Sequence, residues 1–314
     1  MAGQLQKFIG LLILGLAVLV GGSYLPDRPQ FALVSRWAPA PSDFIDIGGQ
    51  QVHFRDEGPR NDPTPLLLLP DLDSSLHSWE GWASALRSRH RVISVDLPGL
   101  GLTGPAPKPA YSPADDVRFV LALMDALRLQ RVVLGGHGLG GDIAWHTALA
   151  APHRVAGLVL VDAEGYPSAA GMPLGSRLTQ SPLMAWLTRW TLTRPLLEAA
   201  LRQRYGDPTR LTATTVDRTH ELLLLDGNRE TRRQRLQQRS NGADAARIAQ
   251  LSLPALIVWG GRDPLQPPSQ ARRFNTDLRS SRLVVFDDLG HLPQEEDPRR
   301  TAPAVQDFLS RLGR

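Results

Sequence analysis

The sequence predicts an α/β domain built on a mostly parallel sheet. Short apolar runs alternate along the chain with segments of helical pattern, and one run leads through a glycine-rich turn directly into a helix. Strands of a parallel sheet are apolar nearly throughout because helices cover both faces. Right-handed crossovers then bring the carboxyl ends of the strands, and with them any site, to one edge of the sheet.

The composition supports one large globular body. The chain has 314 residues, of which 42% are hydrophobic and 21% charged, and this balance excludes a disordered chain or a polytopic membrane protein. Cysteine is absent, which excludes disulfides, thiol nucleophiles and cysteine-bound metals. The formal net charge is +4. No basic motif interleaved with aromatic residues accompanies it, so we expect no nucleic-acid partner.

The first 25 residues are predicted to form a membrane anchor. Residues 8–20 read FIGLLILGLAVLV without a charge, and the apolar character continues to Leu25. About 18 apolar residues just suffice to span a bilayer core. A cleaved signal peptide is the alternative, but no A-x-A-like site precedes Pro26. Lys7 and the amino terminus favour a cytoplasmic N-terminus, whereas Arg28 and Arg36, which follow the run closely, favour the opposite orientation. Of the two we expect the first, with a periplasmic or extracellular body.

The segment 26–42 is expected to be an extended, proline-rich tether. It contains four prolines and shows no clear amphipathic period. The core of the α/β domain is then expected to cover residues 43–163 and 251–314.

Eight apolar runs are the expected strands of this core. They are Phe44–Ile47, Val52–Arg55, Leu66–Leu69, Val92–Val95, Val132–Leu134, Leu158–Val161, Ala255–Trp259 and Leu283–Phe286. The first two, joined through Gly48 and Gly49, favour an antiparallel hairpin at the edge of the sheet. The intervening patterns predict helices at Trp79–Ser88, Pro113–Leu127, Gly141–Ala150, Pro268–Asn275 and Ala302–Leu312.

Residues 164–250 interrupt the alternation and are expected to form an inserted helical lid. The helical segments in it are Pro182–Thr193, Pro195–Arg204 and Asp217–Leu225. Trp186 and Trp190 are four residues apart and would share one helix face, either packing on the core or lining a pocket. Closely spaced arginines follow, which favour a solvated helix face or a contact with an anionic lipid or substrate; they are Arg229, Arg232, Arg233, Arg235 and Arg239.

The glycine-rich turn has the pattern of a nucleophile elbow without its nucleophile. Such a strand-to-helix turn needs small residues two before and two after its central residue. Gly136 and Gly140 meet this need, and His137 is expected to pack beneath the turn. The central position, where a serine would attack, holds Gly138. A phosphate-binding loop is not indicated because the run lacks the G-K-[ST] that such a loop needs.

Asp263 and His291 are the candidate acid and base. Each follows an expected strand, and they succeed the elbow in the order nucleophile, acid, base. A carboxylate in this position can orient the imidazole. Asp162 is an alternative acid position, but Asp263 fits the motif better. No two histidines have the spacing of metal ligands, so we expect neither a metal nor a cofactor.

These motifs give the body a resemblance to the α/β-hydrolases. The matching segments are DLPGLGLTGP at 96–105, the elbow, LVDA at 160–163, WGGRDPL at 259–265 and LGHLP at 289–293. The resemblance covers roughly residues 43–314 and is to the membrane-anchored bacterial members similar to esterases and lipases. It implies an eight-stranded sheet, a small acyl or ester-like ligand, and an elbow serine that an ester acylates and a histidine-activated water frees.

The loop after the run at 66–69 also departs from the family pattern. Members usually show His-Gly there, followed by a residue whose backbone N–H forms the oxyanion hole with the N–H of the residue after the nucleophile. Here the loop reads Pro70-Asp71-Leu72, so the resemblance implies that Leu72 and Leu139 supply the two amides. Asp71 adds a carboxylate beside the place where negative charge would develop, which opposes an oxyanion unless it is turned away or protonated.

The sequence therefore leaves two hypotheses. The first is a membrane-tethered protein with weak or absent serine-hydrolase activity that retains a ligand pocket. The second is an active hydrolase of small esters or acyl compounds that uses a water activated by His291 and Asp263. In a variant of the second hypothesis, Ser74 or Ser75 on the oxyanion-side loop is the nucleophile.

Overall fold

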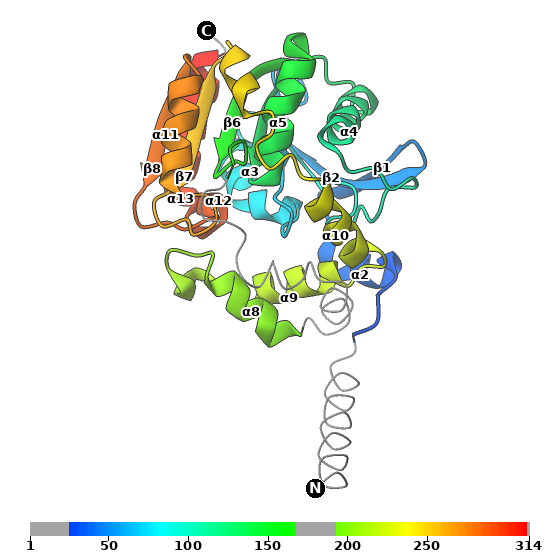
Figure 1. Ribbon diagram of the computed structural model, residues 1–314. Helices are drawn as coiled ribbons and strands as arrows, with labels where there is room; N and C mark the ends of the chain where they lie inside the picture. The colour runs from blue at the N-terminus through cyan, green and yellow to red at the C-terminus, as the bar shows by residue number, and fades with distance from the viewer. Residues whose placement is uncertain (1–24, 168–192, 313–314) are drawn as a thin grey trace, which may run out of the picture.

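The computed structural model describes residues 25–167 and 193–312. An eight-stranded sheet with the order β1-β2-β4-β3-β5-β6-β7-β8 runs through the molecule (Figure 1). Its strands are β1 (Ser42–Ile47), β2 (Gln50–Glu57), β3 (Leu66–Leu69), β4 (Val92–Val95), β5 (Val132–His137), β6 (Val155–Val161), β7 (Ala255–Gly260) and β8 (Ser281–Phe286). β1 and β2 form the antiparallel hairpin, β2 is antiparallel to β4, and the other neighbours are parallel. The prediction of a mostly parallel sheet is thus confirmed.

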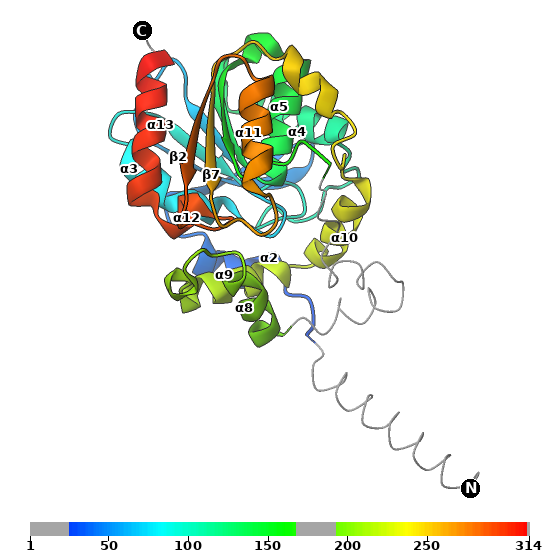
Figure 2. The same ribbon diagram turned by 60° about the vertical axis from the view of Figure 1, so that its left-hand side comes forward.

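Helices cover both faces of the sheet, as Figure 2 shows. One face carries α3 (Glu80–Leu86) and α13 (Pro298–Leu312). The other carries α4 (Pro113–Ala126), α5 (Leu139–Ala150) and α11 (Pro268–Asp277). The four leucines of β3 alternate between these two cores, with Leu66 and Leu68 on the α3 side. Burial on both faces explains why the strand is apolar at every position.

A helical insertion lies between β6 and β7, and the helices of its described part, residues 164–167 and 193–250, lie across one end of the sheet (Figure 1). Its described helices are α8 (Arg194–Arg202), α9 (Ala213–Leu223) and α10 (Asn228–Gln238). Residues 168–192, which include Trp186 and Trp190, lie outside the described residues. Short elements complete the described fold: α12 (Pro293–Glu296) and 3-10 turns at Leu76–Trp79, Pro152–Arg154, Pro208–Arg210 and Ala245–Gln250.

The segment expected to be an extended tether, 26–42, instead contains a helix. α2 (Gln30–Trp37) buries Leu33 and Trp37, which are four residues apart and so share one face. The Trp37 indole N–H donates to Glu221 Oε2 of α9 at 2.7 Å, and Arg36 pairs with the other oxygen of the same carboxylate at 2.5 Å. Two apolar anchors are too few to give a visible period in the sequence, but they suffice to dock one short helix.

The clustered arginines of the insertion each pair with a carboxylate of this chain. The pairs are Arg229–Asp27, Arg232–Asp73, Arg233–Glu230, Arg235–Asp116 and Arg239–Glu164. Arg235 is almost fully buried and also donates to the Pro98 carbonyl at 3.0 Å. A sequence run of like charges does not reveal that acids distant in the chain neutralise it.

Within the described ranges, no helix is long and apolar enough to cross a membrane. Apart from Leu25, the anchor predicted at 1–25 lies outside those ranges.

Candidate active site

The elbow turns at Gly138. β5 ends at His137, and α5 begins at Leu139. Gly138 between them has φ 52° and ψ −115°, a backbone conformation that residues other than glycine rarely adopt. A Cβ on Gly140 would lie 2.7 Å from the Leu69 carbonyl carbon. The turn therefore closes only because a small residue stands at that position.

The Asp71 carboxylate fills the space that a side chain at position 138 would need. A Cβ on Gly138 would lie 2.5 Å from the Asp71 carboxyl carbon and closer still to Oδ1. The register explains this meeting, because Leu69 of β3 pairs with Gly136 of β5, so that two residues later Asp71 stands opposite Gly138. The two sequence departures are thus in contact: the side chain missing at 138 makes room for the carboxylate at 71.

Asp71 also accepts a hydrogen bond from one of the two backbone amides expected to form the oxyanion hole. The Leu139 backbone N–H donates to Asp71 Oδ1 at 2.9 Å. The family resemblance implies the Leu72 backbone N–H as the second amide, and the Leu72 side chain is buried on the same loop. A carboxylate oxygen therefore already stands where the oxygen of a tetrahedral intermediate would be stabilised.

His291 lies between two carboxylates. Its Nδ1 donates to Asp263 Oδ2 at 2.7 Å, and its Nε2 faces Asp71 Oδ2 at 3.4 Å. Its backbone N–H donates to the Arg204 carbonyl at 2.7 Å, which ties the histidine loop to the helical insertion. Asp263 is fixed in turn, since its Oδ1 accepts the backbone N–H of Leu265 at 2.7 Å.

These contacts make the site an ion triplet of Asp71, His291 and Asp263. Burial lowers the pKa of His291, but the charges of Asp263 and Asp71 outweigh burial and raise that pKa to about 9. Burial raises the pKa of Asp71, yet the hydrogen bond with His291 and the nearby charges bring it well below its usual value. The pKa of Asp263 is lowered in the same way, against burial, by the charge of His291. At neutral pH a protonated imidazole therefore faces two ionised carboxylates.

Three further ionisable groups surround the triplet. Burial and the adjacent Asp263 carboxylate raise the pKa of Asp162 well above its usual value, which favours the protonated form of Asp162. Burial and the charge of His291 lower the pKa of His137 to about 4, and the neutral ring donates from Nε2 to the His291 carbonyl at 2.7 Å. Glu164 is partly buried nearby; desolvation raises its pKa, and it pairs with Arg239.

Asp162, the alternative acid, therefore supports Asp263 and does not replace it. Its Oδ1 accepts the backbone N–H of Gly260 at 3.0 Å. The backbone of Asp162 has φ 41°, the left-handed region, which is uncommon for a residue other than glycine. The carboxyl group that contacts His291 Nδ1 is that of Asp263.

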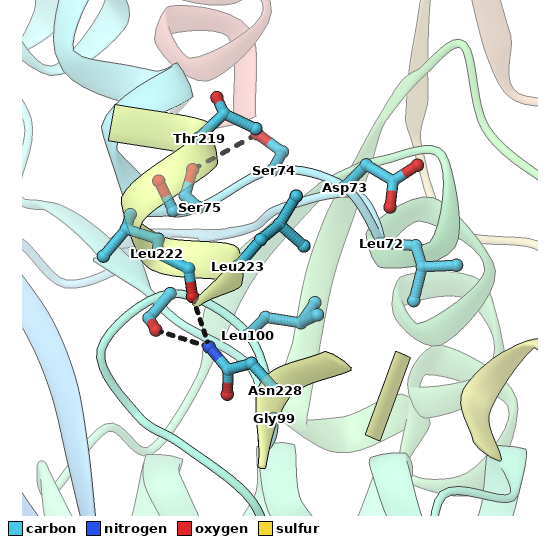
Figure 3. Close-up of a pocket in the computed structure, with 11 residues that line it drawn as sticks. Leu72, Asp73, Ser74, Ser75, Gly99, Leu100, Thr219, Leu222, Leu223 and Asn228 are labelled. Atoms are coloured by element: carbon cyan, nitrogen blue, oxygen red, sulfur yellow. Dashed lines mark hydrogen bonds between the residues drawn. The ribbon is translucent and has the colours of Figure 1, made fainter. Parts of the chain in front are cut away.

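Neither serine of the oxyanion-side loop is directed at His291. Ser75 Oγ is hydrogen-bonded to His77 Nδ1 at 3.0 Å, and His77 Nε2 donates to the Trp37 carbonyl at 2.7 Å. Ser74 Oγ donates to the Ser75 carbonyl at 3.5 Å. Figure 3 shows both serines beside Thr219 of α9, where they line a cavity of about 20 Å³. That volume has room for about one water molecule.

The helical insertion is held against the same loop by an ion-pair cluster at Asp73. Arg204 donates to Asp73 Oδ2 at 2.5 Å, and Arg232 binds both carboxylate oxygens. Burial raises the pKa of Asp73, but the two guanidinium groups outweigh it and bring the pKa far below its usual value. No motif in the sequence indicated this residue, because its partners lie 131 and 159 positions away.

The acids and histidines of the site form two clusters that have the donor types of a metal site. Asp71, His137 and His291 bring one ligand atom each within 4.8 Å of one another, as do Asp162, Asp263 and His291. Both clusters share His291, and each of its ring nitrogens already faces a carboxylate. The site therefore offers an imidazole with one carboxylate at each of its two ring nitrogens.

The fold and these loops define the class to which the chain belongs. Residues 64–298 match the family described as the alpha/beta hydrolase fold, and the chain is a member of that family.

The names of the proteins similar to this chain refer to different activities. The chain is 29% identical over 276 residues to the dihydrolipoyllysine-residue acetyltransferase component of the acetoin cleaving system of Pseudomonas putida, covering 86% of this chain and 70% of the relative. It is 27% identical to the 2-hydroxy-6-oxo-2,4-heptadienoate hydrolase of a Pseudomonas putida strain, covering 84% and 94%. Among solved structures, the meta-cleavage product hydrolase of Pseudomonas fluorescens superposes with a TM-score of 0.74 at 23% identity, covering 86% and 97%.

Proposed function

We propose that this α/β-hydrolase family member does not hydrolyse esters through an acylated serine, and that it keeps the site for a small-molecule ligand. Gly138 occupies the nucleophile position and supplies no attacking atom. The observation that carries the proposal is the position of Asp71, whose carboxylate fills the room for a serine side chain and accepts the Leu139 amide. An acyl substrate would meet a negative charge where its own oxyanion must form, which opposes the reaction.

The alternative is hydrolysis of small esters by a water that His291 activates with Asp263. A general base must be unprotonated, and its efficiency depends on its pKa relative to the working pH. Because the pKa of His291 is raised to about 9, this route predicts a rate that is low at neutral pH and rises towards pH 9. The ion triplet therefore favours the first proposal at neutral pH.

The two are separated by an assay of the full-length chain with p-nitrophenyl acetate and a fluorophosphonate probe. We expect no labelling by the probe, and a hydrolysis rate at pH 7 equal to that of His291→Ala. Fluorophosphonate labelling of the parent, or turnover that His291→Ala abolishes, would overturn the proposal. In the latter case a rate that follows deprotonation near pH 9 identifies the water route.

We further propose that residues 1–25 attach the protein to a membrane and place the body in the periplasm or outside the cell. The uncharged apolar run at 8–20 supports this. Protease treatment of intact cells and of cells with a permeabilised outer membrane tests it. The proposal requires a membrane-bound body that the protease reaches; a body protected in both preparations contradicts it.

A further inference from the structure

The buried histidine of the elbow, His137, has one ring nitrogen without a hydrogen-bond partner. Its Nε2 donates to the His291 carbonyl at 2.7 Å, so the lone pair of the neutral ring lies on Nδ1. Among the residues that the structure describes, Nδ1 finds no partner, and the residue is 0% exposed. A buried acceptor of this kind calls for an explanation, and a metal ion is a partner that the nitrogen of a neutral imidazole takes.

His137 belongs to a compact group of ligand atoms. One atom each of His137, Asp71 and His291 lies within 4.8 Å of the other two. Asp71 Oδ2 and His291 Nε2 are 3.4 Å apart. Because zinc bonds to nitrogen and oxygen are about 2.0–2.1 Å long, two ligands at a tetrahedral angle lie about 3.3–3.4 Å apart. The pair of Asp71 and His291 therefore already has the separation that one zinc ion requires.

We propose that this chain binds one zinc ion through Asp71 Oδ2, His137 Nδ1 and His291 Nε2. Two imidazoles and one carboxylate are a ligand set that zinc takes in proteins. Calcium and magnesium prefer oxygen ligands, which makes them poor candidates for this set. The inference goes beyond the proposed function, because the ion needs neither an ester nor an acyl ligand.

The second polar atom of each ligand is already held, as it is in metal sites. A histidine that binds a metal usually donates its other ring N–H to a carboxylate or a backbone carbonyl. His291 Nδ1 donates to Asp263 Oδ2 at 2.7 Å, and His137 Nε2 donates to the His291 carbonyl. Asp71 Oδ1 accepts the Leu139 N–H at 2.9 Å. These bonds leave one atom of each ligand side chain for the ion.

The charges of the site also favour a divalent ion. The carboxylates of Asp71 and Asp263 carry two negative charges, and a protonated His291 offsets only one of them. An excess of buried charge is costly. A zinc ion that replaces the Nε2 proton of His291 brings the sum of these charges to zero. The Asp71 side chain is 10% exposed and that of His291 2%, so the ion can reach the site by way of the Asp71 carboxylate.

The other group of similar donors, Asp162, Asp263 and His291, fits an ion less well. His291 Nδ1 and Asp263 Oδ2 are 2.7 Å apart, which is a hydrogen-bond distance and too short for two ligands of one zinc ion. Asp263 therefore orients His291 and leaves the opposite ring nitrogen to the metal. Because His137 and His291 are 154 positions apart in the chain, no spacing in the sequence indicates that they share an ion.

Zinc binding is tested with the full-length chain, purified without a polyhistidine tag and freed of metal with EDTA. After removal of the EDTA, zinc chloride is titrated into the chain in competition with a chromophoric zinc chelator. We expect the chain to withdraw one zinc ion from the chelator, and an excess of magnesium not to change this. Cobalt in place of zinc should give the intense visible bands of a four-coordinate ion.

Three variants show whether the expected residues bind the ion. Loss of an outer partner of a metal ligand typically weakens binding about 10–100-fold, which is the effect expected of Asp263→Asn. His137→Gln removes a ligand and should weaken zinc binding by more than about 100-fold. His153→Gln removes an exposed histidine next to the opposite end of β6 and should leave zinc binding unchanged. Zinc should raise the midpoint of urea unfolding for the parent and His153→Gln, but not for His137→Gln.

The results that would overturn the inference are equally specific. They are no zinc bound by the parent, equal zinc affinities of the parent and His137→Gln, and a cobalt spectrum typical of the six-coordinate hydrated ion. If circular dichroism shows that His137→Gln does not fold, His291→Gln takes its place with the same expected loss, and the cobalt spectrum of the parent decides independently of either variant. Fluorophosphonate labelling of the parent, in contrast, bears on the proposed function and not on the zinc site.

Discussion

The substitution Gly138→Ser tests whether Asp71 and position 138 compete for one space. A serine here takes a backbone conformation with φ 52°, and such strain costs about 1–3 kcal/mol. Its Cβ would stand 2.5 Å from the Asp71 carboxyl carbon, so the carboxylate must turn away and lose its hydrogen bond to Leu139. A hydrogen bond to a charged group contributes about 1.5–3 kcal/mol. We therefore expect Gly138→Ser to lower the free energy of unfolding by about 2.5–6 kcal/mol.

A second substitution, Asp71→Gly, should relieve much of this loss. Residues in contact show interaction energies of about 0.5–3 kcal/mol in double-mutant cycles. Because removal of the Asp71 side chain empties the space that a serine needs, the double variant should be more stable than Gly138→Ser alone. Urea unfolding followed by circular dichroism at pH 7 measures all four corners of the cycle.

Gly48→Ser is the matched control for backbone strain. Gly48 has φ 62° in the edge hairpin, and a Cβ there meets nothing within 4 Å. It should therefore cost only the strain, about 1–3 kcal/mol. The reasoning is refuted if Gly138→Ser costs no more than Gly48→Ser, or if the effects at positions 71 and 138 simply add.

Three further predictions concern stability. The raised pKa of His291 contributes stability that is fully present below its ordinary pKa of about 6.5 and is lost as the pH rises through about 9. Urea unfolding should therefore show the free energy of unfolding falling by up to about 3 kcal/mol over this range, and His291→Gln should abolish that fall. Trp37→Ala should lower the unfolding free energy by about 3–5 kcal/mol because it removes the buried anchor of α2. Phe31→Ala, on the exposed side of the same helix, should change the unfolding free energy by less than about 0.5 kcal/mol. Equal effects of the two substitutions would show that α2 is not docked in solution. Arg235→Met should cost about 3–5 kcal/mol by leaving the buried Asp116 carboxylate without its partner, and a loss that disappears at low pH, where Asp116 is protonated, would identify that charge as the cause.

The strands and the core helices could be predicted from the sequence because their signals are local. A run such as Leu66–Leu69 is apolar at each position, and the helix that begins at Pro113 has a capping box at Ser112 and Asp115. The α2 helix was missed because only Leu33 and Trp37 anchor it, and their burial depends on an insertion helix nearly 200 residues away.

The individual residues of the site could be predicted from the sequence, but the contacts between them could not. Gly138 and Asp71 each departed from the family pattern, but their contact depends on the pairing of Leu69 with Gly136 across two parallel strands 67 residues apart. From the sequence alone, the negative charge of Asp71 is expected to oppose an oxyanion. The structure adds that Asp71 is the second partner of His291 and helps to raise the pKa of that histidine to about 9.

The central claim is that the Asp71 carboxylate stands in the place of the missing serine side chain. Fluorophosphonate labelling of Gly138→Ser and of Gly138→Ser combined with Asp71→Gly tests it most directly, with the adduct located by peptide mass spectrometry. The account predicts an adduct on the introduced serine in the double variant and little or none in the single variant, where the Asp71 carboxylate, although displaced from Leu139, still crowds the serine and pairs with protonated His291. Equal labelling of the two variants, or labelling of neither, would contradict it.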